Sequence, residues 1–441
     1  MSIFRAYDIR GLYPKDLNIN TAYKIGRAVA DFFRAKSIAV GRDMRVHGEL
    51  LFNAFTKGIM DQGTDVMDIG LISTPMLYFA SAFLKTKASV MVTASHNPKE
   101  YNGFKLTRQN AIPVSGDTGI KDIEKLYTKG KFRRKGKKGK LIIKVIEKDY
   151  VRHVLKFVRR KEAQFKIVVD AANGMAGKEV PLIFNHLKHT VIPMYFELDG
   201  TFPNHDANPL KGETLTQLKR RVLQEKADLG IAFDGDADRA FFITDEGEAL
   251  PSDFITALIA KSFLKQRKNA KILYDLRSSW IVPEIVKAAK GRPKMCRVGH
   301  AFIKESMRKE KALFGGELSG HFYFRDNWNA DSGIIAALKI LDVMAEEKKP
   351  LSELVNPLKK YYATGELNFE VKDKEKKMNE LARKYKSGRI SRLDGIRIDF
   401  KDWWFNARPS NTEPLLRLNL EAKTKELMKK KKDEIVKIIK R

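Results

Sequence analysis

Residues 229–239 read Leu-Gly-Ile-Ala-Phe-Asp-Gly-Asp-Ala-Asp-Arg, a short apolar run that leads into three aspartates. Strand-like runs of this kind alternate with helix-like ones for most of the chain, which indicates an α/β fold with largely parallel sheets. In such sheets, ligands bind in the loops beyond the carboxyl ends of the strands. The segment therefore predicts an α/β fold with a functional loop at residues 234–239.

The same arrangement occurs three times along the chain. Short apolar runs that end at an acidic residue lie at 37–43, 166–170 and 271–275. Each is followed by a second apolar run that opens into a polar loop, at 90–95, 229–234 and 313–317. Three similar units that each present one loop at a strand end fit the rule for ligand binding by α/β sheets. Chance similarity between three short segments is the alternative.

The end of the chain has a different pattern. Residues 395–400 and 416–422 alternate apolar and polar side chains with the period of two that half-buried strands show, and a helical pattern follows over 424–440. The sequence thus predicts three similar α/β domains with mixed or parallel sheets and a smaller C-terminal α+β domain. The expected domains are 1–148, 149–250, 251–360 and 361–441.

Composition narrows the class of protein. The chain is 43% hydrophobic and 10% aromatic, which is typical of a globular protein. Its single cysteine, Cys296, excludes an intrachain disulfide framework and any multi-cysteine metal site, and suits a reducing compartment. The N-terminus lacks the apolar core of a signal peptide, and no apolar run reaches the ~18 residues of a membrane span. We therefore expect a soluble, cytoplasmic protein without a membrane partner.

The formal net charge is +30. Such an excess can indicate nucleic acid, an anionic surface or anionic substrates. The lysines are spread over the chain, with concentrations at 131–140 and 429–432. The first stretch contains glycines and resembles a solvated linker, and the second lies in the terminal helical pattern. Both are interpreted as solvated faces, so charge alone does not indicate that nucleic acid is the main partner.

Four loops hold residues suited to chemistry. The first, 93–105, places Ser95 at the exit of a predicted strand, beside His96 and ten residues before Lys105. A serine exposed there can carry a phosphoryl group, which neighbouring cations help to neutralise. Taken alone, the Ser-His-Asn-Pro stretch is better explained as an ordinary turn, and the position of Ser95 beside these two side chains is what favours the phosphoryl role.

The second loop holds Asp234, Asp236 and Asp238. Carboxylates so closely spaced cannot be buried unpaired, and oxygen ligands favour Mg²⁺ or Ca²⁺ over zinc. An EF-hand also starts Asp-x-Asp-x-Asp, but here Arg239 replaces its glycine and Asp245 its final glutamate. A solvated acidic turn is a further alternative. Magnesium is the better interpretation, since it binds few carboxylates and leaves places for water or phosphate.

The third and fourth loops suit a sugar and a phosphate. Glu317, in the glycine-rich stretch 315–321, offers a carboxylate that can accept hydrogen bonds from two adjacent hydroxyls. Arg408 precedes three small polar residues, Ser410, Asn411 and Thr412, a combination suited to hold an oxyanion. An ordinary glycine-rich loop and a hairpin connection are the respective alternatives. Neither a P-loop nor a Gly-x-Gly-x-x-Gly fingerprint occurs, so the usual nucleotide sites are unsupported.

In combination, these loops resemble the motifs of the α-D-phosphohexomutases, closest to the phosphomannomutase/phosphoglucomutase branch. Further matching segments are 4–11, 40–43, 170–174, 202–205 and 298–300. The resemblance runs from residue 4 to about residue 422 and so covers essentially the whole chain. It implies four domains in a heart shape around a central cleft, the first three similarly folded.

The resemblance also implies roles for individual residues. Ser95 would be the phosphoserine, and with Asp234, Asp236 and Asp238 it would ligate Mg²⁺. Glu317 and Ser319 would bind the sugar 3- and 4-hydroxyls. The phosphate that is not transferred would be held by Arg408, Ser410, Asn411 and Thr412. Residues that contact substrate or support the site would be Tyr7, Arg10, Arg239, Arg277 and His300. Lys105, and also His96 or His321, would handle protons.

The implied reaction interconverts hexose 1-phosphate and hexose 6-phosphate through a 1,6-bisphosphate that turns over within the site. Glucose 1,6-bisphosphate or mannose 1,6-bisphosphate would serve as activator. Leu318 favours the mannose/glucose branch, because phosphoglucosamine mutases usually have glutamine there. Alternatives are a phosphoglucosamine mutase, a non-catalytic phosphosugar-binding relative, and a nucleic-acid-binding protein. The chain is expected to be a monomer or a small homo-oligomer.

Overall fold

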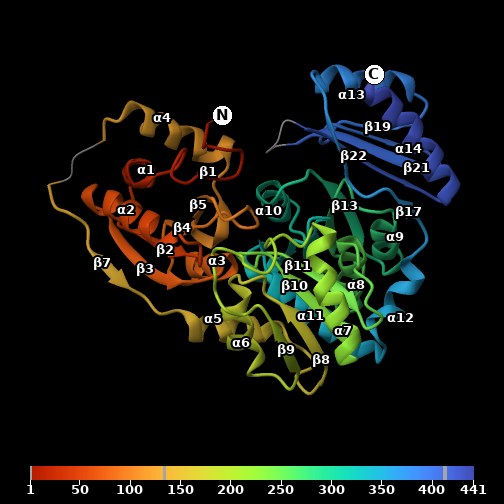
Figure 1. The fold of residues 1–441 in the computed structure, drawn as a ribbon, viewed down its shortest axis with the longest axis horizontal. Coiled ribbons are helices and arrows are strands. Elements are labelled where there is room, and N and C mark those ends of the chain that lie inside the picture. Colours follow the sequence, from red (N-terminus) through yellow and green to blue (C-terminus); the bar gives the residue numbers. More distant parts are fainter. Residues whose placement is uncertain (1, 133–135, 411–414) are drawn as a thin grey trace. The chain divides into compact units, whose positions relative to one another are not determined.

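A computed structural model describes residues 2–132, 136–410 and 415–441 (Figure 1). The chain divides into two compact units. The first comprises Met1–Pro251 and Ser319–Ser352, and the second comprises Ser252–Leu318 and Glu353–Arg441. Each unit contains one group of the residues singled out by the sequence.

The first unit begins with a sheet whose strands are ordered β1-β5-β4-β2-β3-β7, with β6 beside β5. Its strands are β1 (Ile9–Leu12), β2 (Ser37–Arg42), β3 (Asp65–Leu71), β4 (Ala88–Val92), β5 (Tyr101–Arg108), β6 (Ile112–Pro113) and β7 (Leu141–Ile143). The four strands β4, β2, β3 and β7 run parallel, whereas β5 is antiparallel to β4. This antiparallel turn from β4 into β5 contains Ser95.

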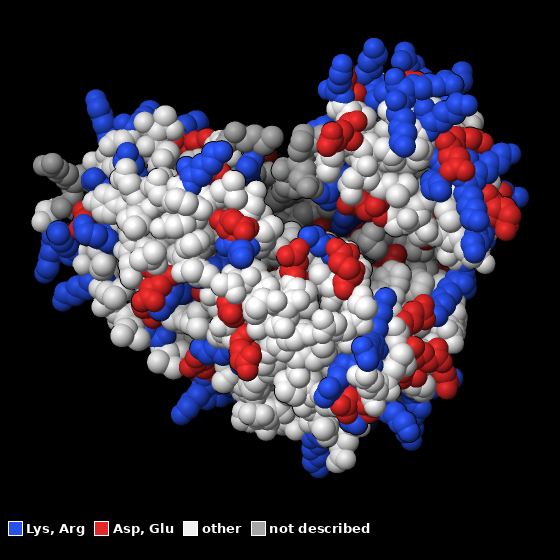
Figure 2. Space-filling model, in the orientation of Figure 1, with Lys and Arg blue, Asp and Glu red and all other residues white. Residues whose placement is uncertain are grey.

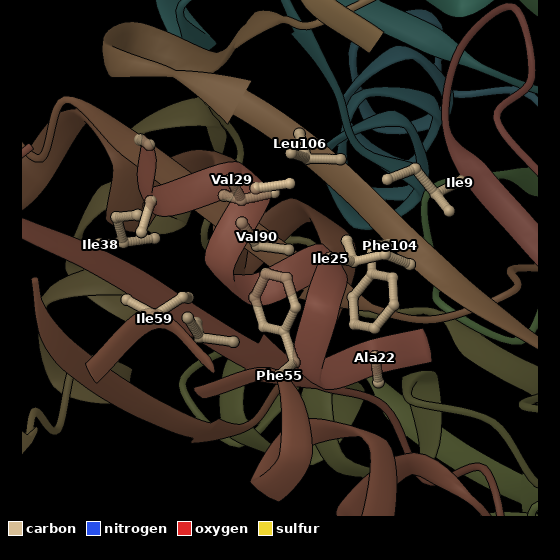
Figure 3. Packing of buried hydrophobic residues seen from close by; sticks show 14 of the residues in the cluster. Ile9, Ala22, Ile25, Val29, Ile38, Phe55, Ile59, Val90, Phe104 and Leu106 are labelled. Carbon is tan, nitrogen blue, oxygen red and sulfur yellow. The ribbon is translucent and has the colours of Figure 1, made fainter. Parts of the chain in front are cut away.

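Helices α1 (Ile19–Phe33) and α2 (Gly48–Asp61) contribute to the core of this sheet. Figure 3 shows Ile25 and Val29 of α1 and Phe55 of α2 facing Val90 and strand residues nearby. Helix α3 (Thr74–Phe83) is buried along nearly its whole length, and α4 (Lys121–Lys129) is mostly exposed. Burial of each large apolar side chain contributes about 1.5–3 kcal/mol, so this core fixes the sheet that carries Ser95.

A second sheet of the first unit has the strand order β11-β10-β8-β9. Its strands are β8 (Lys166–Asp170), β9 (Thr190–Met194), β10 (Leu229–Phe233) and β11 (Ala240–Thr244). The neighbouring helices along the chain are α5 (Glu147–Val154), α6 (Ala176–Phe184) and α7 (Thr216–Glu225). The unit also includes β15 (Phe322–Phe324), β16 (Ala330–Asp331) and α11 (Gly333–Glu347), and α12 (Leu351–Val355) follows along the chain. Strand β10 is buried throughout.

The second unit contains a parallel arrangement of β12 (Lys271–Asp275) between β13 (Arg292–Cys296) and β14 (Phe314–Gly316). Its helices here are α8 (Ser252–Gln266), α9 (Ile281–Ala288) and α10 (His300–Lys309). An antiparallel sheet of the order β17-β22-β21-β20-β19 follows, with β18 beside β22. Its members are β17 (Tyr362–Ala363), β18 (Leu367–Glu370), β19 (Arg389–Ser391), β20 (Ile396–Asp399), β21 (Trp403–Pro409) and β22 (Leu415–Ala422).

The threefold repeat predicted from the sequence is present. In each copy the first apolar run is the middle strand and the second run is its parallel neighbour. The triplets are β4-β2-β3, β10-β8-β9 and β14-β12-β13. The three similar α/β domains are therefore confirmed, and each presents one of the first three loops after its second strand.

The predicted C-terminal α+β domain is also confirmed. The alternating segments form β20 and β22, and α13 (Lys374–Lys384) and α14 (Lys425–Lys440) complete the domain. Helix α14 buries Ile435, Ile438 and Ile439, the apolar stripe expected from its pattern, whereas Leu427 is partly buried. Thr424 caps this helix, accepting a hydrogen bond from the amide of Leu427, a preferred arrangement at helix starts.

The excess positive charge lies largely on solvated surface. Figure 2 shows lysine and arginine side chains standing out from the face in view, with acidic side chains among them. Lys429 and Lys430 of α14 are exposed, as are the described lysines of the stretch 131–140. None of the helices within the described ranges combines the length and the apolar composition needed to cross a lipid bilayer.

Glu179 of α6 is a buried carboxyl group that makes the stability of the fold depend on pH. Its buried carboxylate accepts a hydrogen bond from the Tyr150 hydroxyl, and burial raises its pKa from 4.5 to about 7, although hydrogen bonds from Ser73 and Tyr150 oppose the rise. The folded protein thus binds this proton more tightly than the unfolded chain. The resulting stabilisation is complete below pH 4.5 and is lost as the pH rises through about 7.

We expect the Glu179→Gln variant to lack this pH dependence. Between pH 5 and pH 8 the wild-type protein should lose about 2.5 kcal/mol of unfolding free energy relative to the variant. Denaturant unfolding of both proteins at several pH values measures the difference. Parallel pH profiles for the two proteins would show that Glu179 does not titrate in this range.

Candidate active site

Ser95 lies in the turn between β4 and β5. Its backbone has a left-handed conformation, with φ at 51°, which is uncommon for a residue other than glycine. The side chain is buried, and its Oγ donates a hydrogen bond to Asp234 Oδ2 at 3.0 Å and lies 3.2 Å from His96 Nδ1. Unusual backbone geometry of this kind costs about 1–3 kcal/mol and persists only where surrounding contacts enforce it.

Arg45 provides those contacts. Its guanidinium donates hydrogen bonds to the backbone carbonyls of Ser95 at 2.7 Å, Asn97 at 2.6 Å, and Pro98 and Tyr101 at 2.9 Å each. The side chain of Arg45 is fully buried, and its role was not predicted from the sequence. It follows the matching segment 40–43 by two residues, and that proximity was its only signal in the sequence.

Asp43 anchors Arg45 in turn. The two form a fully buried ion pair at 3.5 Å, and Thr93 donates a hydrogen bond to the same carboxylate at 2.5 Å. Burial raises the pKa of Asp43 to about 6, with Arg45 and Thr93 acting in the opposite direction. Gly235 of the acidic loop also borders the turn, where a Cβ would lie 2.6 Å from the Ser95 carbonyl oxygen. The glycine within Asp-Gly-Asp thus permits the close approach of the two loops.

The carboxylate oxygens of Asp234, Asp236 and Asp238 lie within 4.8 Å of one another, and all three residues are buried. Lys105 on β5 donates hydrogen bonds to Asp236 at 2.7 Å and Asp238 at 2.6 Å. Thr74, at the start of α3, donates to Asp236 at 2.6 Å. Burial lowers the pKa of Lys105, but the two aspartates raise it by more, so the amine stays charged.

The three aspartates fit a metal ion. Burial, and then the neighbouring Asp238 and Asp236, hold the pKa of Asp234 well above its usual range, so its ionised form is disfavoured without a further cation. Asp236 Oδ1 is buried and has no hydrogen-bond partner among the described residues. A hard divalent cation offers the interaction that such an oxygen lacks. An all-oxygen donor set suits Mg²⁺ or Ca²⁺.

Two further predicted residues, Arg239 and His321, border the triad. Arg239 Nε donates to His321 Nε2 at 3.3 Å and lies 3.5 Å from Asp234. The same His321 nitrogen is 3.3 Å from Asp238, and Nδ1 of the ring is 3.1 Å from the Ser319 hydroxyl. The ring therefore links Ser319 to Arg239 and Asp238 of the acidic loop. Asp331, which was not predicted, lies 3.9 Å from His321 Nε2.

His96 and Arg10 complete this group. Burial, followed by the charges of Arg239 and Arg10, holds the pKa of His96 well below its usual range, so the imidazole is neutral at pH 7. A neutral imidazole can accept a proton from the adjacent Ser95 hydroxyl. Arg10 on β1 donates to Asn97 of the serine turn at 2.7 Å. Tyr7 precedes β1 and is half-buried.

A second centre lies in the second unit, around Arg277. Its guanidinium pairs with Asp275 at 2.8 Å and lies 3.8 Å from Glu317. Glu317 is buried and accepts a hydrogen bond from the Gly299 amide at 2.9 Å, immediately before His300 opens α10. The structure thus brings together Arg277 and Glu317, with His300 adjacent to the residue that binds Glu317.

The predicted phosphate loop follows β21. Arg408 is buried on that strand, and its guanidinium lies 3.5 Å from Glu366, as does that of Arg277 at 3.4 Å. The amide of Ser410 donates to the Leu415 carbonyl at 2.8 Å. Asn411 and Thr412 lie outside the described residues. Glu366, which was not predicted, connects the predicted Arg277 and Arg408.

Family comparison accounts for nearly the whole chain. Phosphoglucomutase/phosphomannomutase alpha/beta/alpha domain I matches residues 1–134, domain II matches 148–247, domain III matches 251–361, and the C-terminal domain matches 366–438. The chain belongs to the phosphoglucomutase/phosphomannomutase family. Membership of this family makes it a phosphohexomutase, an enzyme that transfers a phosphoryl group within a hexose phosphate.

Individual relatives support the assignment of this phosphohexomutase to the family. A phosphomannomutase of Methanocaldococcus jannaschii is 42% identical over 443 residues, which cover 100% of this chain and 98% of the relative. A crystal structure of a phosphoglucomutase/phosphomannomutase family protein from Burkholderia thailandensis is 31% identical, with a TM-score of 0.92 over 99% of this chain and 97% of that one. An N-acetylphosphoglucosamine mutase of Aspergillus fumigatus, solved with glucose 1,6-bisphosphate, has a similar fold at 13% identity, with a TM-score of 0.62 over 99% of this chain and 94% of that one.

Proposed function

We propose that this phosphohexomutase interconverts the 1- and 6-phosphates of mannose, glucose or both through a phosphorylated Ser95. The observation that carries the proposal is the contact of the Ser95 hydroxyl with Asp234 at 3.0 Å, inside a buried cluster of three carboxylates and two cations. Phospho-Ser95 would transfer its phosphoryl group to the free hydroxyl of the sugar phosphate. The resulting 1,6-bisphosphate would return its other phosphate to Ser95, which restores the enzyme.

Mg²⁺ is the proposed metal. Asp234, Asp236 and Asp238 would hold it, together with the phosphate on Ser95, and the bound ion supplies charge neutralisation for the transferring phosphoryl group. Lys105 and Arg239 carry fixed positive charge beside the same loop. Charge-stabilising groups that are already in place cost no rearrangement as the transition state forms. The neutral His96 is the proposed acceptor of a proton at Ser95 Oγ, and Lys105 and His321 are the further candidates for proton transfer.

The remaining predicted residues would bind the sugar phosphate. Glu317 and Ser319 would accept or donate hydrogen bonds at the 3- and 4-hydroxyls, which are nearly interchangeable when the bisphosphate turns end over end. Arg408 and Ser410, with Asn411 and Thr412, would hold the phosphate that is not being transferred. Tyr7, Arg10, Arg277 and His300 would support substrate binding. Glucose 1,6-bisphosphate, which the A. fumigatus mutase was solved with, or mannose 1,6-bisphosphate is the proposed activator.

The proposed domain limits are 148/149, 250/251 and 360/361, each at the edge of a gap between the family matches or one residue from it. A mannose substrate is supported by the phosphomannomutase relative, and a phosphoglucosamine mutase is the alternative. The enzyme is proposed to act in the cytoplasm, as a monomer or a small homo-oligomer, without nucleic acid as its main partner.

A coupled assay tests the proposal. Purified protein with Mg²⁺ and a catalytic amount of glucose 1,6-bisphosphate would be given mannose 1-phosphate, glucose 1-phosphate or glucosamine 1-phosphate. Conversion of mannose or glucose phosphate, abolished by EDTA and restored by Mg²⁺, is expected. Preferential conversion of glucosamine 1-phosphate would instead support the alternative branch. No conversion of any sugar by folded protein would contradict the proposed activity.

Arg408→Ala is expected to weaken substrate binding more than it slows chemistry. Charge-assisted hydrogen bonds from a guanidinium to phosphate contribute about 1.5–3 kcal/mol, so KM should rise about 10- to 100-fold while kcat changes less. Steady-state kinetics of the variant measure both constants. Arg389→Ala, on strand β19 of the same sheet with a side chain 84% exposed, is the matched control and should retain wild-type constants. Unchanged kinetics for Arg408→Ala would remove this arginine from the substrate site.

A further inference from the structure

Glu366 is surrounded by three arginines. Its carboxylate accepts a hydrogen bond from Arg417 at 2.9 Å and lies 3.4 Å from Arg277 and 3.5 Å from Arg408. It is located in the short connection between β17 and β18, and its side chain is 24% exposed. Burial raises the pKa of Glu366, but the charges of Arg277, Arg417 and Arg408 together lower it below its usual range. The group is therefore an anion held by an excess of cations.

The three arginines are not equally neutralised. Arg277 has a second partner, Asp275, which accepts from its Nε at 3.2 Å and from its terminal nitrogen at 2.8 Å. Arg408 is 2% exposed, and its Nε is buried without a hydrogen-bond partner among the described residues. Its contact with Glu366 is at the long limit of a hydrogen bond. Burial, and then repulsion from Arg277, lower the pKa of Arg408, and the charges of Glu366 and Asp394 offset only part of this fall.

A buried guanidinium with incomplete pairing favours an additional anion. A phosphate dianion can satisfy Arg408 with paired, charge-assisted hydrogen bonds that the distant carboxylate of Glu366 does not provide. Glu366 is thus a weakly bound partner of Arg408, and a phosphate from outside the protein would bind this arginine more strongly. Arg417 and Arg277 would keep hold of Glu366 when Arg408 leaves it.

We propose that the Glu366 carboxylate competes with the substrate phosphate for Arg408. In the free enzyme Glu366 pairs with Arg408, and the phosphate of a bound sugar phosphate replaces it there. This inference rests on the proposed role of Arg408 in holding the phosphate that is not transferred. Glu366 then determines how tightly Arg408 binds the phosphate. Competition from the carboxylate weakens phosphate binding and lowers the cost of release, because Arg408 regains a counter-ion each time the phosphate leaves. A mutase whose bisphosphate must exchange its two ends needs such a reversible grip.

Neutralising Glu366 should therefore tighten phosphate binding. In Glu366→Gln the side chain keeps its shape and an accepting oxygen, but Arg408 loses its competing anion and the bound phosphate loses a nearby negative charge. We expect the dissociation constant of inorganic phosphate to fall at least about fivefold. We also expect KM for glucose 1-phosphate to fall and kcat to decrease, as slower release becomes limiting.

The test compares calorimetric titrations of inorganic phosphate into metal-free protein. Four proteins are measured: wild type, Glu366→Gln, Arg408→Ala, and the double variant. The matched control is Glu370→Gln, which removes the same charge from an exposed position at the end of β18. Arg408→Ala should bind phosphate at least about tenfold more weakly. The gain from Glu366→Gln should disappear in the double variant, because it depends on Arg408, and the control should match wild type.

The outcomes separate this inference from the proposed function. Weaker or unchanged phosphate binding by Glu366→Gln, with weaker binding by Arg408→Ala, would show that Glu366 only braces the arginines and would overturn the inference. The phosphate-binding role of Arg408 would then stand. Unaltered phosphate binding by Arg408→Ala would overturn both that role and the inference about Glu366. Should Glu366→Gln fail to fold, Glu366→Asp keeps the charge but shortens the reach to Arg408. It should also bind phosphate more tightly than wild type, and the absence of any gain would contradict the inference.

Discussion

Replacing Ser95 with alanine is expected to reduce mutase turnover by about 10⁴-fold or more while leaving the fold intact, as removal of a catalytic nucleophile does in other enzymes. The hydroxyl is the only group removed, and alanine adopts the left-handed backbone at residue 95 at a cost similar to that of serine. Loss of its hydrogen bond to Asp234 should change the unfolding free energy by only about 1 kcal/mol.

The coupled assay and denaturant unfolding measure the two effects, and mass spectrometry of protein incubated with glucose 1,6-bisphosphate reports phosphorylation. Ser89→Ala is a matched control. Ser89 is buried on β4, the strand that leads into the Ser95 turn, and its hydroxyl is 2.9 Å from the Thr86 hydroxyl. The control therefore loses a comparable hydrogen bond away from the acidic loop. It should keep wild-type turnover. Normal turnover in Ser95→Ala, or phosphorylation that persists in it, would refute the phosphoserine mechanism.

Arg45→Met is expected to cause the largest loss of stability, about 3–5 kcal/mol of unfolding free energy. Breaking a fully buried ion pair by removing one partner leaves an uncompensated charge, here Asp43. The four carbonyls of the serine turn also lose their donor. Turnover should fall about 100-fold even in protein that remains folded, because small displacements of reacting groups have effects of this size.

Unfolding experiments and hydrogen exchange over residues 93–103 measure both consequences. The destabilisation should be smaller at pH 5 than at pH 8, because a protonated Asp43 no longer needs a cation, and burial already raises its pKa to about 6 in the presence of Arg45. Arg42→Met is the matched control. Arg42 forms a longer, partly exposed ion pair with Asp68 at 3.8 Å and should cost about 1 kcal/mol. An equally small cost for Arg45→Met would mean that the turn holds its shape without Arg45.

Much of the fold was readable from local pattern. The apolar runs at 37–43, 166–170 and 271–275 are the middle strands of the three repeated triplets, because a strand buried on both faces must be apolar along its length. Period-two alternation identified β20 and β22 in the same way. The positions of Ser95, Asp234 and Glu317 in loops were predictable because each residue follows an apolar strand. Loops at the carboxyl ends of strands are where α/β folds bind their ligands.

The sequence by itself determined the strands, the order of the domains, and the chemical type of each loop, since these depend on side chains close together along the chain. Tertiary structure alone decided which residues hold those loops in place. Arg45 bonds to carbonyls around fifty residues away, Thr74 to Asp236 across 162 residues, and Glu366 to Arg408 across 42. Contacts between residues so far apart along the chain cannot be predicted from a local pattern of apolar and polar residues. A buried charge or hydroxyl finds its partner only when folding has removed water from both, and that pairing is a property of the assembled core.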